Sequence, residues 1–158
     1  MFRKMRRQFK AISSEEMTAL LVNERRATLA VNGDDGYPYA IPVNYYYDPE
    51  SQRVYFHSSQ VGHKADALKA DDKVCFTVYG NECIKDEAWA PYLQSVVIFG
   101  RCRKIEDPSK KMAVMKIFAM KYYPDEATVD EAIAEAGEIA LMFEIEIEHM
   151  TGKLIQER

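Results

Sequence analysis

Apolar and polar residues alternate along several short segments of the chain, as they do in β-strands that bury one face. The clearest case is residues 139–147, where Phe143, Ile145 and Ile147 alternate with glutamates. The apolar side chains should face a core and the glutamates should face water. Similar patterns predict two extended runs within residues 27–48 and further strands at residues 53–58, 73–79 and 95–106.

The second extended run within residues 27–48 contains two prolines. It follows the loop Gly33–Gly36, whose glycines suit a hairpin, and it includes Pro38 and Pro42. Because proline has no backbone N–H to donate to a ladder, this strand must lie at a sheet edge, contain a bulge or turn a barrel corner. A bulged or open ladder also leaves backbone groups free for a ligand.

Helical features mark four other segments. Ser13 and Glu16 form a capping-box pattern that predicts a helix over residues 14–23. Asp107 followed by Pro108 indicates the start of another helix, with an N-cap and a proline at the first helical position. Its inward residues would be Met112, Met115, Phe118 and Ala119. The other two helices are expected at residues 62–70 and, as a short acidic helix, at residues 128–136.

These elements favour a mainly β protein. The strands follow one another in hairpin order rather than alternating with helices, which is typical of an antiparallel barrel with helices outside. Residues 80–93 are expected to form an irregular or short-strand connection, and Gly100 is expected at a bulge or bend. We predict one domain over residues 1–158, of which residues 1–12 form a basic N-terminal arm.

Composition and charge narrow the class of protein. The chain has 158 residues, 47% of them hydrophobic and 29% charged, which is an ordinary balance for a globular domain. A net charge of −4 argues against a dedicated nucleic-acid binder. No apolar run approaches the roughly 18 residues of a membrane span, and the basic arm is not followed by the apolar region of a signal peptide. We therefore expect a cytoplasmic protein without membrane or nucleic-acid partners.

The cysteines and other potential metal ligands indicate no metal site. Cys75, Cys83 and Cys102 have no C-x-x-C spacing and their number is odd, so neither a zinc site nor a disulfide framework is expected. The sequence also contains no glycine-rich nucleotide loop and no nucleophile elbow.

The segment Val54–Leu68 carries the strongest candidate chemistry. A strand leads into Ser58 and Ser59, and then His63 and Lys64 open a helix. Backbone N–H groups at a helix start favour an anion, and these side chains add hydrogen-bond donors and positive charge at the same place. The segment therefore predicts a phosphate-binding site, and the aromatic strand sequence before it suggests a larger, flat ligand such as a flavin nucleotide.

Four segments follow one another along the chain: NGDDGYPYAIPVNYYYD, VYFHSSQVGHKADAL, SVVIFGRCRKIEDP and IEIEHMTGK. In this order they resemble the pyridoxamine 5'-phosphate oxidase-like split-barrel flavoproteins, and within them the 5-nitroimidazole resistance (Nim) branch. The resemblance extends from about Ala27 to Lys153, and its most specific element is the spacing from FHS to GHK. It implies a split antiparallel β-barrel of six to seven strands that forms a homodimer with FMN in a groove at the interface.

The resemblance also implies which residues contact FMN. The flavin ring would lie against Ile41, Pro42, Val43 and Asn44, and His57, Ser58, His63 and Lys64 would follow along the cofactor. Where the oxidases hold the phosphate with an Arg-Lys pair, this chain has His63 and Lys64. Phosphate affinity should therefore fall above the histidine pKa, normally about 6.5.

His57 and Trp89 each have two competing interpretations. His57 is expected to be catalytic in the flavin pocket, the alternative being a strand histidine that hydrogen-bonds a neighbour. By the resemblance, Trp89 and Ser95 lie near the flavin, although Trp89 would equally suit burial in the dimer contact. His149 is expected at the surface beyond the last strand.

The expected function is that of an FMN-dependent oxidoreductase that reduces a nitroaromatic or another small molecule, with an external electron donor such as NAD(P)H. The chain lacks the basic, proline-containing tail with which the true oxidases hold pyridoxamine phosphate, which argues against the vitamin B6 reaction. One alternative is a non-catalytic flavin- or haem-binding barrel for redox sensing or storage, with His57 or His63 as an iron ligand. Another is a barrel without flavin that holds pyridoxal phosphate or no ligand.

Overall fold

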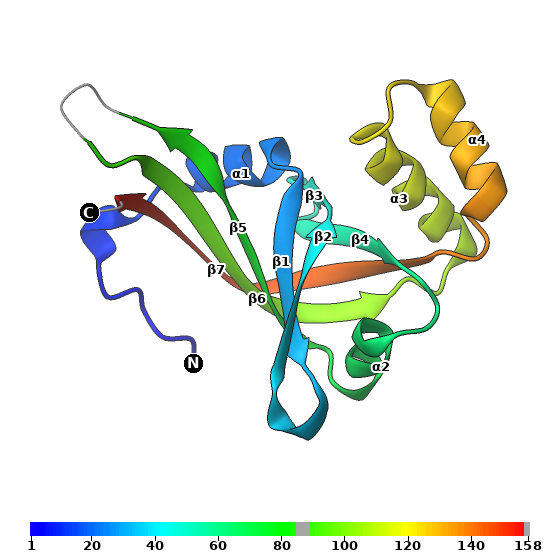
Figure 1. Ribbon diagram of the computed structural model, residues 1–158, viewed down its shortest axis with the longest axis horizontal. Helices are drawn as coiled ribbons and strands as arrows, with labels where there is room; N and C mark the ends of the chain where they lie inside the picture. The colour runs from blue at the N-terminus through cyan, green and yellow to red at the C-terminus, as the bar shows by residue number, and fades with distance from the viewer. Residues whose placement is uncertain (85–88, 157–158) are drawn as a thin grey trace.

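The chain folds around one curled antiparallel sheet of seven strands (Figure 1). A computed structural model describes residues 1–84 and 89–156. The order across the sheet is β2-β1-β5-β6-β7-β4-β3. The strands are β1 Arg26–Asn32, β2 Pro38–Asn44, β3 Tyr46–Asp48, β4 Arg53–Ser58, β5 Lys73–Cys83, β6 Tyr92–Lys104 and β7 Leu141–Gln156.

The two edge strands of this sheet are neighbours in the sequence. β2 ends at Asn44 and β3 begins at Tyr46, so Tyr45 alone joins the two ends of the curled sheet. The sheet therefore forms a half-open barrel rather than a flat layer (Figure 1). The predicted mainly β, antiparallel split barrel with flanking helices is confirmed.

In the described part of the chain, four α-helices lie around the sheet: α1 Ser14–Asn23, α2 His63–Ala70, α3 Pro108–Met120 and α4 Glu126–Ala136. The capping box of Ser13 and Glu16 is formed, and Asp107 caps α3 as predicted. α4 begins before the predicted residue 128, because the Asp125 side chain accepts the backbone N–H of Thr128 and acts as the N-cap. Among the described residues, no helix is long and apolar enough to cross a membrane.

Two strands are longer than the sequence predicts. Within residues 80–93, β5 continues to Cys83, which pairs with Tyr92 of β6; residues 85–88 lie outside the described part of the chain. β7 runs to Gln156 because every part of β6, from Tyr92 to Lys104, pairs with it. His149 therefore lies within a strand rather than beyond it. The predicted irregularity at Gly100 is confirmed as a shift in β6–β7 register, where a side chain would collide with the Glu146 carbonyl oxygen.

β2 is an edge strand of the sheet, which is one of the three positions that its prolines allow. The Gly33 N–H donates to the Tyr37 carbonyl oxygen, which makes these two residues a hydrogen-bonded pair. Because such pairs alternate in an antiparallel ladder, Pro38 opposite Asn32 and Pro42 opposite Thr28 occupy non-hydrogen-bonded positions. Their missing N–H groups therefore cost β1 no ladder bond.

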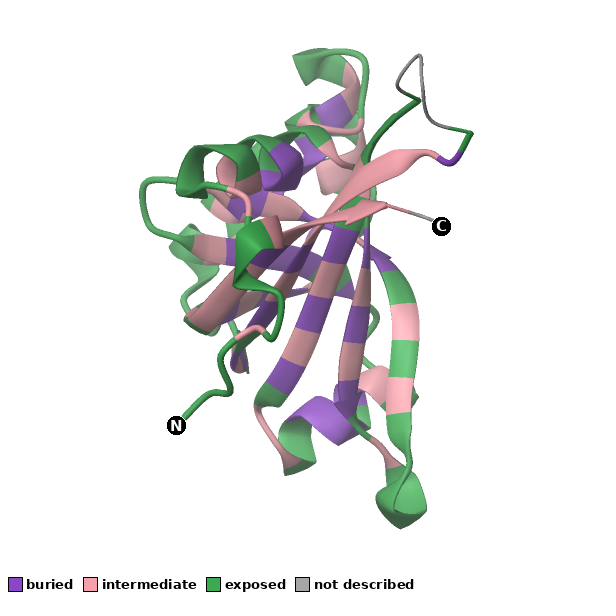
Figure 2. Ribbon diagram, turned by 90° about the vertical axis from the view of Figure 1, so that its left-hand side faces the viewer, coloured by how far each residue is buried: buried purple, intermediate pink, exposed green. Residues whose placement is uncertain are grey.

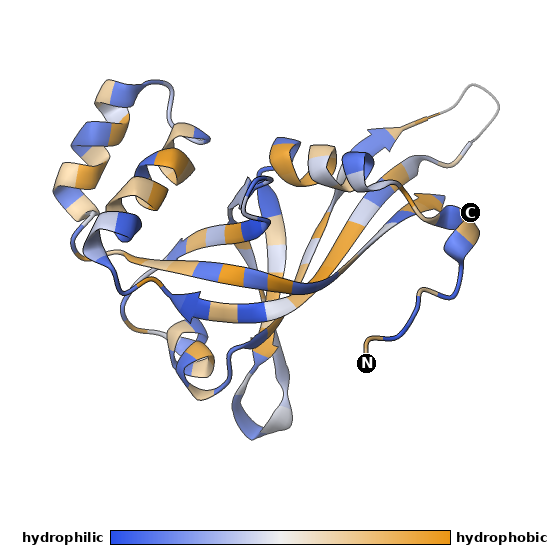
Figure 3. Ribbon diagram, turned by 180° about the vertical axis from the view of Figure 1, so that it is seen from behind, coloured by the Kyte–Doolittle hydropathy of each residue, from blue (hydrophilic) through white to orange (hydrophobic). Residues whose placement is uncertain are grey.

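Two hydrophobic clusters of described residues hold the fold together. Buried and less buried residues alternate along the strands (Figure 2). The larger cluster fills the barrel and includes Leu29, Phe56, Phe76 and Ile145. The smaller joins α3 to the opposite face of β4 and β7 through Tyr55, Ile105, Met115, Phe118 and Met142. Hydrophobic and hydrophilic residues alternate along the strands accordingly (Figure 3). Phe143 and Ile145 are buried and Glu146 is exposed, as the alternation predicts.

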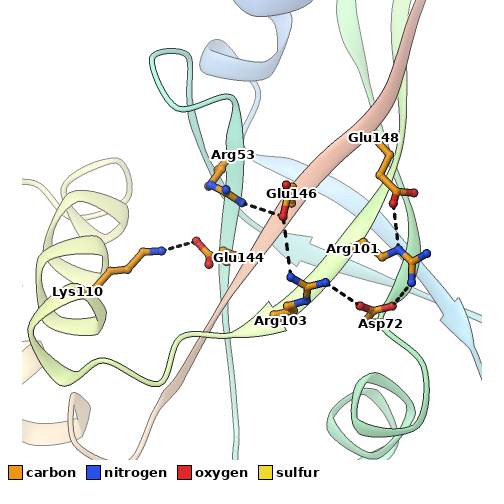
Figure 4. Close-up of polar contacts among 8 residues, drawn as sticks. All are labelled: Arg53, Asp72, Arg101, Arg103, Lys110, Glu144, Glu146 and Glu148. Carbon is orange, nitrogen blue, oxygen red and sulfur yellow. Dashed lines mark hydrogen bonds and ion pairs between the residues drawn. The ribbon is translucent and has the colours of Figure 1, made fainter.

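Ion pairs cover the outside of the sheet beyond the Gly100 bulge (Figure 4). Arg101 lies 2.7 Å from Asp72 and 3.0 Å from Glu148, and Arg103 joins Asp72 to Glu146 at 3.5 and 4.0 Å. Ion pairs that water can reach contribute little to stability, because solvent screens their charges. Their main consequence is to make this part of the outer surface strongly polar.

Candidate functional site

A cavity of about 320 Å³ lies between the outside of the sheet and the helices α3 and α4. Two residues singled out in the sequence, Asn44 and His57, line it together. Its walls are formed by Asn44, His57, Met115, Phe118, Ala119, Tyr122, Tyr123, Ala132, Ile133, Ala136, Gly137 and Ala140. None of these residues is an aspartate, glutamate, lysine or arginine, so the cavity suits an uncharged, largely apolar group.

The alternation of strand side chains brings Asn44 and His57 to the cavity. Along β4, Val54, Phe56 and Ser58 face the inside of the barrel, whereas His57 projects to the other face. There its imidazole packs edge-on against the Phe118 ring of α3, with ring centroids 5.3 Å apart. Asn44 ends β2 two residues after Pro42 and therefore projects to the same outer face as Pro42.

The surroundings of His57 favour its neutral form. Burial beside α3 lowers the pKa of His57 below its ordinary value, and the positive charge of Lys64 lowers it further. A neutral imidazole can donate a hydrogen bond from one nitrogen and accept one at the other. His57 can therefore hold or transfer a proton at the cavity wall near neutral pH.

Sequence reasoning did not identify the α3–α4 side of the cavity. Tyr122 and Tyr123 follow the last turn of α3, and Ala132, Ala136 and Gly137 form a wall of small residues on α4. A sequence signal was present in the spacing of Ala132 and Ala136, which places both on one helix face. Nothing in the sequence alone showed that this face lies opposite His57.

The predicted phosphate-binding segment forms a strand, a loop and a helix start. Gly62 precedes α2 with φ at +127°, and no side chain caps the helix N-terminus. The Lys64 ammonium lies 5.6 Å from the Phe56 ring, and burial lowers its pKa. Ser58 is buried on the same strand face as Phe56, while the Ser59 hydroxyl donates to the Val61 carbonyl oxygen. Lys64 and Ser58 thus lie on the barrel side of β4.

His63 is directed elsewhere than Lys64. Its ring stacks on Tyr39 with centroids 4.0 Å apart, and its Nε2 atom lies 3.5 Å from an Asp34 carboxylate oxygen. The two consecutive residues that replace the Arg-Lys pair of the oxidases therefore have different neighbours. Their joint action on one phosphate stays a prediction.

The other residues expected at the site do not line the cavity. Val43 is buried in the main core and Ile41 packs against it, whereas Pro42 is exposed. Trp89 is 83% exposed, and Ser95 lies within β6 between Tyr79 and Lys153. Their proposed contacts with a cofactor stay predictions.

His149 differs from the simple surface residue that the sequence suggests. It is half-buried, and its ring stacks on Phe2 of the N-terminal arm with centroids 4.8 Å apart. Its Nε2 atom is buried with no hydrogen-bond partner among the described residues. The cause is that β7 extends past residue 147, which places His149 opposite Phe99 in the sheet.

Rows of uncharged residues cross five strands on the outside of the sheet. We call this the uncharged sheet face. Its members are half-buried or exposed and lie beside one another in the strand register: Thr28, Ala30, Ala40, Pro42, Cys75, Thr77, Val97, Phe99, His149 and Thr151. At Pro42 it adjoins Asn44, so it leads to the cavity. The bulge at Gly100 separates it from the ion pairs of Figure 4.

Comparison of the sequence with family models gives a match over residues 13–154 to the family described as pyridoxamine 5'-phosphate oxidase. This match spans most of the chain. A search of curated proteins gives no significant match.

Several solved structures have a similar fold. A proposed 5-nitroimidazole antibiotic resistance protein from Bacteroides thetaiotaomicron has a TM-score of 0.77 at 19% identity, covering 92% of this chain and 87% of the other. A FAD-binding protein from Mesorhizobium loti has a TM-score of 0.67 at 22% identity, covering 92% and 97%. A FAD- and haem-binding protein from Mycobacterium smegmatis has a TM-score of 0.75 at 18% identity, covering 92% and 72%. At these identities the likeness shows the fold.

The environment of His57 predicts how it titrates. We expect the His57 imidazole to titrate below about 6.5 in an NMR pH series, because burial and Lys64 disfavour its charged form. Lys64→Met should raise this pKa toward the ordinary value. The unfolded chain takes up the proton first, so this histidine reduces stability as pH falls below about 6.5. A midpoint at or above that value would contradict the assigned environment.

Proposed function

The chain belongs to the pyridoxamine 5'-phosphate oxidase family, and we propose on that basis that it binds FMN and acts as a flavin-dependent reductase of small molecules, with nitroaromatic compounds as the substrate class. The observation that carries the proposal is the convergence of Asn44 and His57 on one uncharged cavity. The structural similarity to a proposed 5-nitroimidazole resistance protein supports the choice of substrate class.

The residues present fit a flavin nucleotide. The apolar and aromatic cavity walls suit a flat ring system, whereas the uncapped start of α2 with Lys64 and Ser58 suits a phosphate. Both environments lie at the end of β4, which ends at Ser58, and the charge of Lys64 acts on His57 there. One extended ligand that passes the end of this strand would reach both, with its ring near His57 and its phosphate near Lys64.

Each group has a distinct proposed task. Bound flavin, once reduced by an external donor such as NAD(P)H, would supply the electrons. Asn44 would orient the ring edge by hydrogen bonding, and His57 would take up a proton from solvent and pass it to the reacting group. Phe118 and Tyr122 would exclude water from this side of the cavity.

A second candidate function is binding without turnover. One structure of this fold is a FAD- and haem-binding protein, and neutral imidazole is the form in which histidine ligates iron. The lowered pKa of His57 is compatible with that role as well. The visible spectrum of the purified protein separates the two, since a Soret band indicates haem and a band near ~450 nm indicates flavin.

We further propose that two copies associate through the uncharged sheet face and that this contact completes the FMN site. A surface five strands wide without aspartate, glutamate, lysine or arginine is unusual in a chain with 29% charged residues. Depletion of charge is typical of the buried centre of protein interfaces. Because this face adjoins Asn44, a second copy seated on it would border the cavity.

Lys64 is expected to contribute directly to FMN affinity. Lys64→Met should weaken FMN binding by about tenfold or more, because a charge-assisted contact to phosphate is lost. Lys69→Met is the matched control on the same helix, since the Lys69 side chain is 72% exposed and lies 3.7 Å from Asp66, and it should bind like the wild type. Quenching of FMN fluorescence measures both. A wild-type protein that stays colourless and ignores added FMN would refute the proposed cofactor.

His57 is expected to act in the reaction rather than in holding the cofactor. His57→Ala should retain the flavin absorbance but lower kcat/KM for anaerobic nitroimidazole reduction by about 100-fold, the usual contribution of a general acid. Unchanged turnover in this variant would exclude the chemical role. A yellow wild-type protein that fails to reduce any nitroaromatic would favour the non-catalytic alternative.

Association through the uncharged sheet face is open to a direct test. Val97→Glu places a charge in the middle of this face and should convert the dimer to a monomer in sedimentation velocity, with weaker FMN binding. Lys104→Glu, at the opposite end of the same strand, should leave the dimer intact. A wild-type protein that sediments as a monomer at all concentrations would contradict the proposal.

A further inference from the structure

The strand break at Tyr45 is held by a side chain distant in sequence. Tyr45 lies between β2 and β3 and belongs to neither strand. Its backbone N–H donates to the Tyr122 hydroxyl at 2.8 Å, and its carbonyl oxygen lies 2.6 Å from the same hydroxyl. The Tyr122 side chain thus satisfies both backbone groups of a residue that has left the ladder.

The same hydroxyl also reaches the segment between α1 and β1. It lies 2.9 Å from the Arg25 carbonyl oxygen, and its single proton can be donated there or to Tyr45. The Arg25 guanidinium lies 5.0 Å from the centre of the Tyr122 ring. One phenol therefore ties the end of α3 to two segments of the barrel.

Lys121 reinforces this anchor. Its ammonium donates to the Glu24 carbonyl oxygen and lies 4.3 Å from the centre of the Tyr45 ring. The Tyr45 side chain is fully buried and meets Phe76 edge-on, with ring centroids 5.1 Å apart. Two consecutive residues thus contact Tyr45: Tyr122 bonds its backbone, and Lys121 lies over its ring.

The ring of Tyr122 leads toward the second polar group of the cavity. It contacts the Phe118 ring with centroids 5.1 Å apart, and Phe118 meets His57 at 5.3 Å. The hydroxyl meanwhile fixes Tyr45, whose preceding residue is Asn44. Tyr122 is therefore linked through its hydroxyl to Asn44 and through its ring to His57.

We propose that Tyr122 is the positioning residue of the cavity, which sets the orientation of Asn44 through the strand break and of His57 through Phe118. Its role in ligand binding rests on the proposed function. The effect of Tyr122 on Asn44 and His57 does not rest on the proposed function, because these contacts exist within the chain itself.

The test compares Tyr122→Phe with Tyr37→Phe. Tyr122 lines the cavity and its hydroxyl contacts Tyr45, whereas Tyr37 is 76% exposed and does not line the cavity. In Tyr122→Phe we expect FMN affinity to fall by about tenfold or more, since two backbone groups lose their partner. We also expect the NMR signals of the Asn44 side-chain amide to shift and the His57 pKa to move toward its ordinary value, because the ring that contacts Phe118 beside His57 loses its anchor. Tyr37→Phe should stay within about twofold of the wild type in affinity, with both signals unchanged.

A second variant keeps the inference testable if Tyr122→Phe does not fold. Phe118→Leu leaves the hydroxyl anchor in place and removes the ring between Tyr122 and His57. It should shift the His57 pKa while leaving the Asn44 amide unchanged.

Different results separate the two proposals. A Tyr122→Phe protein that melts earlier but keeps the wild-type FMN affinity, Asn44 signals and His57 pKa would assign Tyr122 a merely structural role and overturn the inference. A wild-type protein that does not bind FMN would refute the proposed function, while the NMR signals would still test the positioning role.

Discussion

Burial of every second strand side chain in the barrel interior sets the register of the strands, and the other features of the structure follow from that register. Each strand contributes every second side chain to the interior, and a shift of register by one residue would expose the whole set. The register is thereby determined, and so is the identity of every residue on the outer face. His57 reaches the cavity because Phe56 and Ser58, on either side of it, face inward. Packing on the inner face of β4 therefore decides which of its residues the candidate site contains on the outer face.

The bulge at Gly100 divides the outer face into two surfaces with different properties. On one side Arg101 and Arg103 exchange ion pairs with acidic residues of β7, and their hydrated charges disfavour burial against another protein. The uncharged sheet face lies on the other side of the bulge. A partner that covers this face strips water from few charged groups. This difference supports placing a second copy on the uncharged surface, whose edge adjoins the cavity.

The helices α3 and α4 form a second layer outside the barrel and supply one wall of the site. Their own cluster, which includes Met115 and Phe118, packs on the outside of β4 and β7. The small residues of α4 leave space opposite His57 instead of filling it. The end of α3 is fastened to the barrel by polar contacts of Lys121 and Tyr122 to backbone groups. Such contacts fix orientation more strictly than apolar packing does, because hydrogen bonds are directional.

Features that depend on residues close together in the chain could be predicted from the sequence alone. Alternation identified the strands, the capping box and the Asp107 cap located helix starts, and Pro38 with Pro42 indicated the edge strand. His57 and Ser58 point to opposite faces simply because they are consecutive in a strand. The contacts that assemble the site depended on the tertiary structure.

Contacts formed in the folded chain complete the site. Tyr122 bonds the backbone at Tyr45, 77 residues earlier, and α4 lies opposite His57. His63 turns to Tyr39 while Lys64 turns to Phe56. Local periodicity contains no information on such contacts, because they form only when the sheet curls and brings its two edge strands together.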